Sequence, residues 1–174
     1  MLAAILIFLS SLFYPEQIQP RAAKKYDTVD DKSIHIKNIR NAVYSLGSAV
    51  QLQQAFGKIK ALKEKDEMLG GYDYTYKYNG LVVSFNEKEF EDVAVKSPQY
   101  NVYLNTEVFK IGDTDAKLKK VFPLAYAEST TEPDHTRILR IQTRHGKILN
   151  DAAVVITLSA KGAINEIWIG NDNS

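Results

Sequence analysis

Apolar and polar residues alternate strictly over 72–78, where the chain reads YDYTYKY, and an Asn79-Gly80 step separates this run from LVVSF at 81–85. Asn-Gly between two alternating runs favours a hairpin with a two-residue turn. Such a turn pairs 78 with 81, 76 with 83 and 74 with 85. The tyrosines then share a face with Leu81, Val83 and Phe85. The opposite face, which we expect to meet water, carries Asp73, Thr75, Lys77 and Ser84.

The C-terminal third predicts three more strands, near 136–143, 152–159 and 163–169, with a turn at Lys161-Gly162 between the last two. Their apolar face contains Leu139, Ile141, Val154, Ile156, Leu158, Ile167 and Ile169. Their opposite face contains Arg140, Gln142, Thr157, Glu166 and Trp168. A further strand near 100–104 is expected to join the two groups of strands into one sheet.

The order of elements is repeated. Residues 43–48 (VYSLGS) align with 108–113 (VFKIGD), and each stretch precedes a short amphipathic segment. Ser48 with Gln51 forms a capping box at the start of the first helix, and Asp113 or Thr114 is the expected N-cap of the second. Gly57 ends the first helix and Pro123 the second.

These elements predict an α+β fold of two tandem repeats, 34–105 and 106–174. In each repeat a short helix packs on an antiparallel meander, and the sheets would join into one concave surface.

The N-terminal segment is not expected to belong to this fold. Residues 2–14 are apolar without a charge, and Pro15 ends the run. The run is shorter than the roughly 20 residues of a membrane-spanning helix and fits the apolar region of a signal peptide. A retained hydrophobic anchor and an arm that docks on a partner are the alternatives for 1–14. Residues 15–33 read as a polar linker. We expect a secreted or periplasmic protein with no stable membrane span in the mature chain.

The amino-acid composition limits the kinds of catalytic or binding site that the chain can carry. The chain has 174 residues, a formal net charge of +1 and no cysteine. The near-zero charge gives no global field for nucleic acid, and without cysteine there are no disulfides, thiolate nucleophiles or Cys-zinc sites. The three histidines show no metal-ligand spacing, and Gly-x-Ser-x-Gly is absent. We predict no metal, no cofactor and no enzymatic activity; a hydrolase would need two convergent titratable groups, which the sequence does not show.

The repeated pattern, an extended stretch, Leu/Ile-Gly-Ser/Asp, a short helix ending in Phe56-Gly57 or Phe122-Pro123 and a tyrosine-rich hairpin, resembles β-lactamase-inhibitor-protein-like domains. It is similar also to the related small lipoprotein of the outer-membrane barrel assembly machine. The resemblance covers roughly 43–170. It implies an exported, non-catalytic module whose joined sheet grips a partner protein. The chain departs from both families in having no cysteine, so no disulfide, lipid anchor or target-contacting residue is carried over.

The sequence therefore predicts a protein-binding surface on the water-facing side of the strands, inhibitor-like or accessory to the cell envelope. Trp168 is the only tryptophan, and an exposed tryptophan among polar residues is typical of an interface hot spot. The predicted partner-binding residues are Trp168, Glu166, Arg140, Thr157, Lys77, Thr75 and Tyr103. The alternative is a carrier whose tyrosine-lined face closes over a small apolar ligand.

Overall fold

A computed structural model describes residues 26–67 and 70–171, which form two β-sheets and three short α-helices around one hydrophobic core. In spatial order the large sheet contains β1 (Thr28–Asp30), β11 (Arg137–His145), β12 (Ile148–Leu158), β13 (Ile164–Asn171), β7 (Glu89–Val95), β6 (Leu81–Asn86), β5 (Tyr72–Tyr78) and β4 (Leu62–Lys65). A two-residue strand, β10 (Thr130–Thr131), also pairs with β11. Among the described strands, only β1 and β11 pair in parallel.

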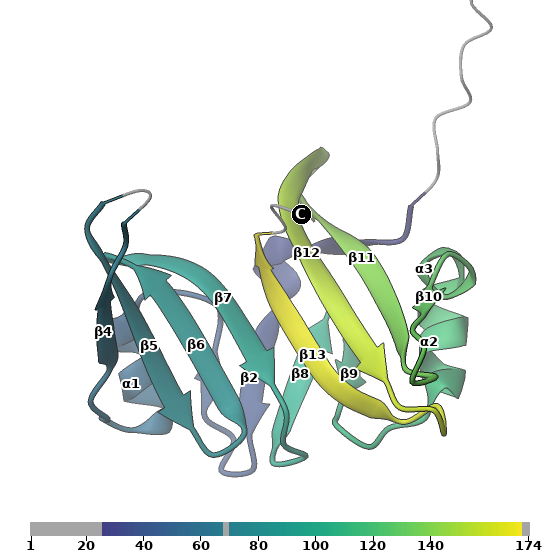
Figure 1. The fold of residues 1–174 in the computed structure, drawn as a ribbon, viewed down its shortest axis with the longest axis horizontal. Helices are drawn as coiled ribbons and strands as arrows, with labels where there is room; N and C mark the ends of the chain where they lie inside the picture. Colours follow the sequence, from purple (N-terminus) through teal and green to yellow (C-terminus); the bar gives the residue numbers. More distant parts are fainter. Residues whose placement is uncertain (1–25, 68–69, 172–174) are drawn as a thin grey trace, which may run out of the picture.

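The small sheet and the helices lie on one side of the large sheet, which is in front in Figure 1. The small sheet has the order β3 (Val43–Tyr44), β2 (His35–Asn38), β8 (Tyr100–Leu104) and β9 (Glu107–Phe109). The helices are α1 (Ala49–Phe56), α2 (Asp115–Val121) and α3 (Pro123–Ala127), with a 3-10 turn η1 at Asp31–Ser33. The fold is therefore α+β with antiparallel sheets, as the sequence predicts. None of the helices in the described ranges is long and apolar enough to cross a bilayer.

The core lies between the two layers. Along each central strand of the large sheet, every second side chain points into it. All seven apolar positions predicted for the C-terminal strands are buried, together with Leu81, Val83 and Phe85 of the first hairpin. Leu52 of α1 and Leu118 of α2 are completely buried and close the core from the helical side. Alternation of period two thus places one face of each strand in the core.

The Asn79-Gly80 hairpin is confirmed in register, with Tyr78 opposite Leu81 and Tyr74 opposite Phe85. The first helix begins as predicted, because the Ser48 hydroxyl accepts from the Gln51 amide N–H and the Gln51 side chain accepts from the Ser48 N–H. The second helix has Thr114 as its N-cap residue, without a side-chain capping bond.

Two predictions about elements are wrong, those for the strand 100–104 and for the linker, and the one for Pro123 is confirmed but incomplete. The strand 100–104 exists, but as β8 it belongs to the small sheet; β7 and β13 join the two parts of the large sheet. Pro123 ends α2 and also begins α3, because proline is well suited to the first position of a helix. The linker expected at 15–33 is too long, since Thr28–Asp30 and Asp31–Ser33 form β1 and η1.

Asn105, at the β8–β9 turn, fastens this N-terminal segment to the fold. Its Oδ1 accepts from the Asp30 N–H and the Ser33 hydroxyl, both at 3.1 Å, and its own N–H donates to Ser33 Oγ at 3.0 Å. Its backbone has φ 57, in the left-handed region that asparagine tolerates better than most residues. Nearby, Asp27 accepts from the Ala125 N–H at the start of α3. Residues 27–33 are thus bound to the second half of the chain, and β1 covers part of the β11 edge.

Replacing Asn105 separates its two roles. Asn105→Gly keeps the left-handed conformation but loses the side-chain bonds, so we expect a loss of about 1–2 kcal/mol in the free energy of unfolding. Asn105→Ala should lose about 1 kcal/mol more, because an L side chain is strained there. Urea unfolding measures both. A glycine variant as stable as wild type would show that the bonds to Asp30 and Ser33 contribute nothing.

Candidate binding surfaces

The face of the large sheet turned away from the core, called the open face below, carries six of the seven predicted binding residues. The cross-strand register aligns Lys77, Val82, Ala94, Trp168, Val155 and Arg140 in one row. A second row contains Thr75, Ser84, Asp92, Gly170, Ala153 and Gln142, and Glu166 pairs with Thr157 in a third. Within the described part of the chain, Figure 1 shows no helix or strand in front of this face.

Trp168 lies near the middle of the open face, on β13, where the two parts of the sheet meet. Its neighbours in the row, Ala94 and Val155, are small, and all three are only partly buried. The indole also lies over Gly170, since a Cβ built there would come within 2.7 Å of the ring carbon Cζ2. Glycine at 170 therefore leaves room for the ring to lie down on the sheet, which presents a broad aromatic surface.

The charged members of the predicted set lie around this centre. Lys77 and Arg140 are exposed, at the two ends of the tryptophan row. Glu166 forms an ion pair with Lys96, with 3.2 Å between Oε1 and Nζ. At about 4.8 Å between strands, Arg140 and Lys77 lie roughly 10 and 14 Å from the Trp168 backbone. An apolar centre with a polar border is the usual anatomy of a protein interface.

Tyr103 does not belong with the other six. It lies on β8 in the small sheet, and its ring stacks on His35 at 4.2 Å between centroids. The prediction placed it on the open face because the strand 100–104 was assigned to the wrong sheet. Tyr103 therefore serves as a surface position remote from the open face.

The tyrosine side of β5 is filled with rings. Phe56 of α1 makes edge contacts with Tyr78 and Tyr100, and Tyr76 does so with Phe85. The Tyr78 hydroxyl donates to the Gly57 carbonyl at 2.9 Å, and burial, with the nearby Tyr76 and Tyr100, raises the pKa of Tyr78 to about 12. A small ligand on this side would have to displace these contacts, so nothing here favours the carrier.

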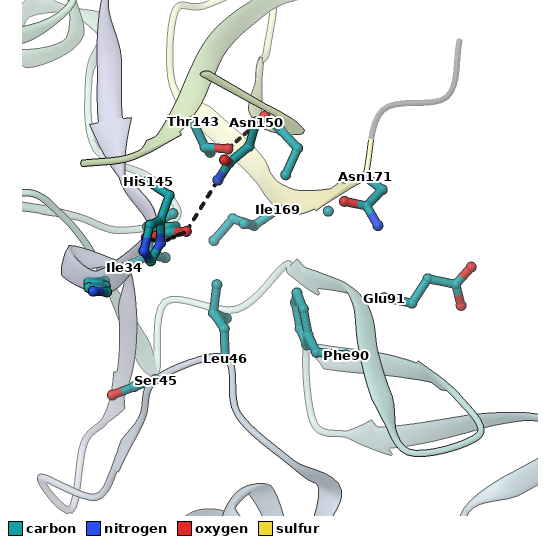
Figure 2. Close-up of a pocket in the computed structure, with 14 residues that line it drawn as sticks. Ile34, Ser45, Leu46, Phe90, Glu91, Thr143, His145, Asn150, Ile169 and Asn171 are labelled. Carbon is teal, nitrogen blue, oxygen red and sulfur yellow. Dashed lines mark hydrogen bonds and ion pairs between the residues drawn. The ribbon is translucent and has the colours of Figure 1, made fainter. Parts of the chain in front are cut away.

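Sequence reasoning missed a cavity of about 340 Å³ beside the β7–β13 junction. Its apolar walls are Ile34, Leu46, Phe90 and Ile169. In Figure 2, Leu46 points into it from the β3–α1 connection and Phe90 from β7. Leu46 has φ 53, a conformation that costs a residue with a side chain about 1–2 kcal/mol. The alternation of apolar residues gave no sign of this site, because its walls come from four separate segments.

Polar groups form one side of the cavity. His145 Nδ1 lies 3.0 Å from Asp31 Oδ2, and the Asn150 side-chain amide donates to the same carboxylate at 3.2 Å (Figure 2). These contacts hold the β11–β12 hairpin against η1. Burial opposes ionisation of Asp31, but the bonds from His145 and Asn150 outweigh it and hold its pKa below the usual range. No group of three or more His, Cys, Asp or Glu side chains in the described ranges is arranged to hold a metal ion.

Acidic side chains gather where β6 and β7 form a bulge, at the other side of the cavity. Burial, then the charges of Asp92, Asp73 and Asp66, raise the pKa of Glu91, which lines the cavity. Burial also raises the pKa of Asp92, although a hydrogen bond with Ser84 opposes the shift. Both shifts mean that negative charge is costly here and that a cation would be stabilised.

Gly170→Ala should lift the Trp168 indole. The new methyl group would lie within 2.7 Å of the ring, 2.6 Å of Asp92 Cβ and 3.0 Å of the Glu91 carbonyl oxygen. We expect a red-shifted emission and stronger acrylamide quenching of the only tryptophan, with a stability loss of about 1–3 kcal/mol. Thr157→Ala, on the same face, is the control and should leave the emission unchanged. An unaltered spectrum in Gly170→Ala would contradict the position given for the ring.

Asp92→Asn should stabilise the protein at neutral pH. Because the pKa of Asp92 is raised on folding, the folded state binds the proton more tightly, and stability falls as the pH rises from about 3.9 through the folded value. The asparagine side chain is uncharged over this whole pH range. The melting temperature of the Asp92→Asn variant should therefore exceed that of wild type at pH 7, and the gain should be absent near about pH 3. Asp134→Asn is the control, because hydrogen bonds from Thr136 lower the pKa of Asp134 and removing that charge should give no gain.

No protein-family model, curated protein or solved structure matches this chain. The resemblance to inhibitor-protein-like domains therefore depends on the sequence pattern quoted above. The function has to be argued from the surfaces themselves.

Proposed function

We propose that this chain is an exported, non-enzymatic module that binds another protein through the open face. The observation that carries the proposal is the position of Trp168, half-buried among small residues at the centre of a face that no described element covers. A rigid aromatic anchor with exposed charges around it provides large contact area at low entropy cost. Export rests on the apolar run at 2–14, which lies outside the described residues.

The proposal includes a tandem duplication. Its support is the order of elements: β2, β3, α1 and β4 to β7 are followed by β8, β9, the α2–α3 pair and β10 to β13. The pairing of equivalent strands supports it further. β7 pairs with β13 and β2 pairs with β8, each antiparallel, as an approximate two-fold axis between two units would require. A division at 96–99 suits these units better than 105/106, which would cut the β8–β9 hairpin.

The duplication explains why the binding surface is broad. Each unit alone would give a sheet of four strands, and the β7–β13 ladder joins the two into one continuous face. Trp168 and Ala94 lie opposite each other in that ladder. The proposed hot spot is thus at the junction of the units, where residues from both can contact one partner.

Site-specific photocrosslinking in the cells that naturally make the protein tests this function. A photoreactive residue at Thr157 or Ser84, both on the open face, should capture the same partner, and one at Tyr103 should not. With the partner identified, Trp168→Ala should weaken its binding by about 2 kcal/mol, or roughly 30-fold.

Tyr103→Ala, which removes an aromatic ring from the small sheet, is the matched binding control and should change affinity little. Capture from Tyr103 but not from the open face would place the interface elsewhere. Equal affinity of the Trp168→Ala variant would remove the hot spot and with it the proposal.

A further inference from the structure

The tip of the β11–β12 hairpin carries two adjacent apolar side chains in solvent. Ile148 is 73% exposed and Leu149 is 51% exposed. They follow Lys147 in the turn, and Arg144 is paired with Leu149 across the hairpin. In Figure 1 this hairpin extends beyond the rest of the sheet. An exposed isoleucine and leucine on a projecting, basic tip mark a contact site.

The cavity beside the β7–β13 junction has the complementary character. Its walls are the buried Ile34 and Ile169 with Leu46 and Phe90. Its volume of about 340 Å³ exceeds that of an apolar side chain several-fold. On the β7 side Glu91 lies in the field of Asp92, Asp73 and Asp66, where a cation lowers the electrostatic cost. Lys32 lines the opposite side, at η1, so the cavity favours an apolar side chain whose accompanying positive charge lies on the β7 side.

The two features are neighbours, since His145 and Asn150, on either side of the tip, line the cavity. When a projection and its receptor lie side by side on one molecule, a two-fold axis brings each projection to the other copy's receptor. The same patch is then used twice, and the assembly closes at two copies.

We propose that the chain forms a two-fold symmetric homodimer in which the Lys147–Leu149 tip of each copy enters the partner's cavity. Ile148 and Leu149 contact the apolar walls, and Lys147 lies near Glu91 of the other copy. The dimer is argued from the hairpin tip and the cavity alone, so the inference does not rest on the proposed function. The polar contacts of Asp31 with His145 and Asn150 hold the hairpin at the angle from which its tip projects.

Sedimentation velocity over a range of concentrations, with full-length protein, tests the dimer. Wild type should show a concentration-dependent monomer–dimer equilibrium. Ile148→Asp should raise the dissociation constant tenfold or more, because the carboxylate would be desolvated in an apolar cavity. Ile39→Asp is the matched control: Ile39 is 74% exposed but lies in the turn between β2 and β3, and its variant should dimerise as wild type does.

A charge swap makes the test specific. Glu91→Lys and Lys147→Glu should each weaken self-association, because every contact between the two sites becomes like-charged. Mixed together they should form a heterodimer at least tenfold tighter than either homodimer, since both of its contacts pair opposite charges. Thermal melts confirm that each variant is folded.

Three results would overturn the dimer. The first is a wild-type protein that stays monomeric at about 1 mM, a concentration that detects very weak association. A dimer equally tight in Ile148→Asp would use another surface. Failure of the mixed charge variants to associate better than each alone would show that Lys147 and Glu91 do not meet.

Discussion

The antiparallel ladder between β7 and β13 is the contact on which the rest of the structure depends. It pairs Val95 with Ile167 and Val93 with Ile169, all of them buried, so the two parts of the large sheet share one core. The same ladder sets the alternation of the open face and fixes Trp168 in its centre. Where the ladder ends, at Asp92 and Gly170, the strands separate and the cavity begins. One short region of backbone pairing thus determines both proposed contact sites.

Local signals predicted the parts of the fold that local chemistry controls. The Asn79-Gly80 turn fixes the register of its hairpin, and alternation assigned the buried and open faces of β11, β12 and β13. Six of the predicted binding residues share one face for this reason. Long-range pairing was not predictable in the same way. Tyr103 alternates as a strand residue in either sheet, and only the pairing of β8 with β2 decides which sheet contains it.

The cavity and β1 show a second limit. Thr28–Asp30 has a single apolar residue, Val29, which is too little for alternation to indicate a strand, and it is held by Asn105 from a turn far along the chain. The cavity walls come from η1's flank, the β3–α1 connection, β7 and β13, so no window of sequence contains the site. The left-handed backbone of Leu46 was equally unpredictable from the sequence, because leucine rarely adopts this conformation and here it is packed against the core.

The two edges of the large sheet are unequal. The outer edge of β11 is paired with β1 at 142–144 and with β10 at 137–138. Only 139–141 stay unpaired on that edge, too few residues to receive another strand. On the opposite side β4 is exposed at all four positions, with Lys63 resting over the Tyr72 ring. A fibre that grows by edge-to-edge pairing of sheets requires two free strand edges on every molecule, one for each neighbour. With one edge reduced to the three residues of β1 and the two of β10, this chain offers a single long edge for extending its sheet, and growth through that edge alone stops at a pair.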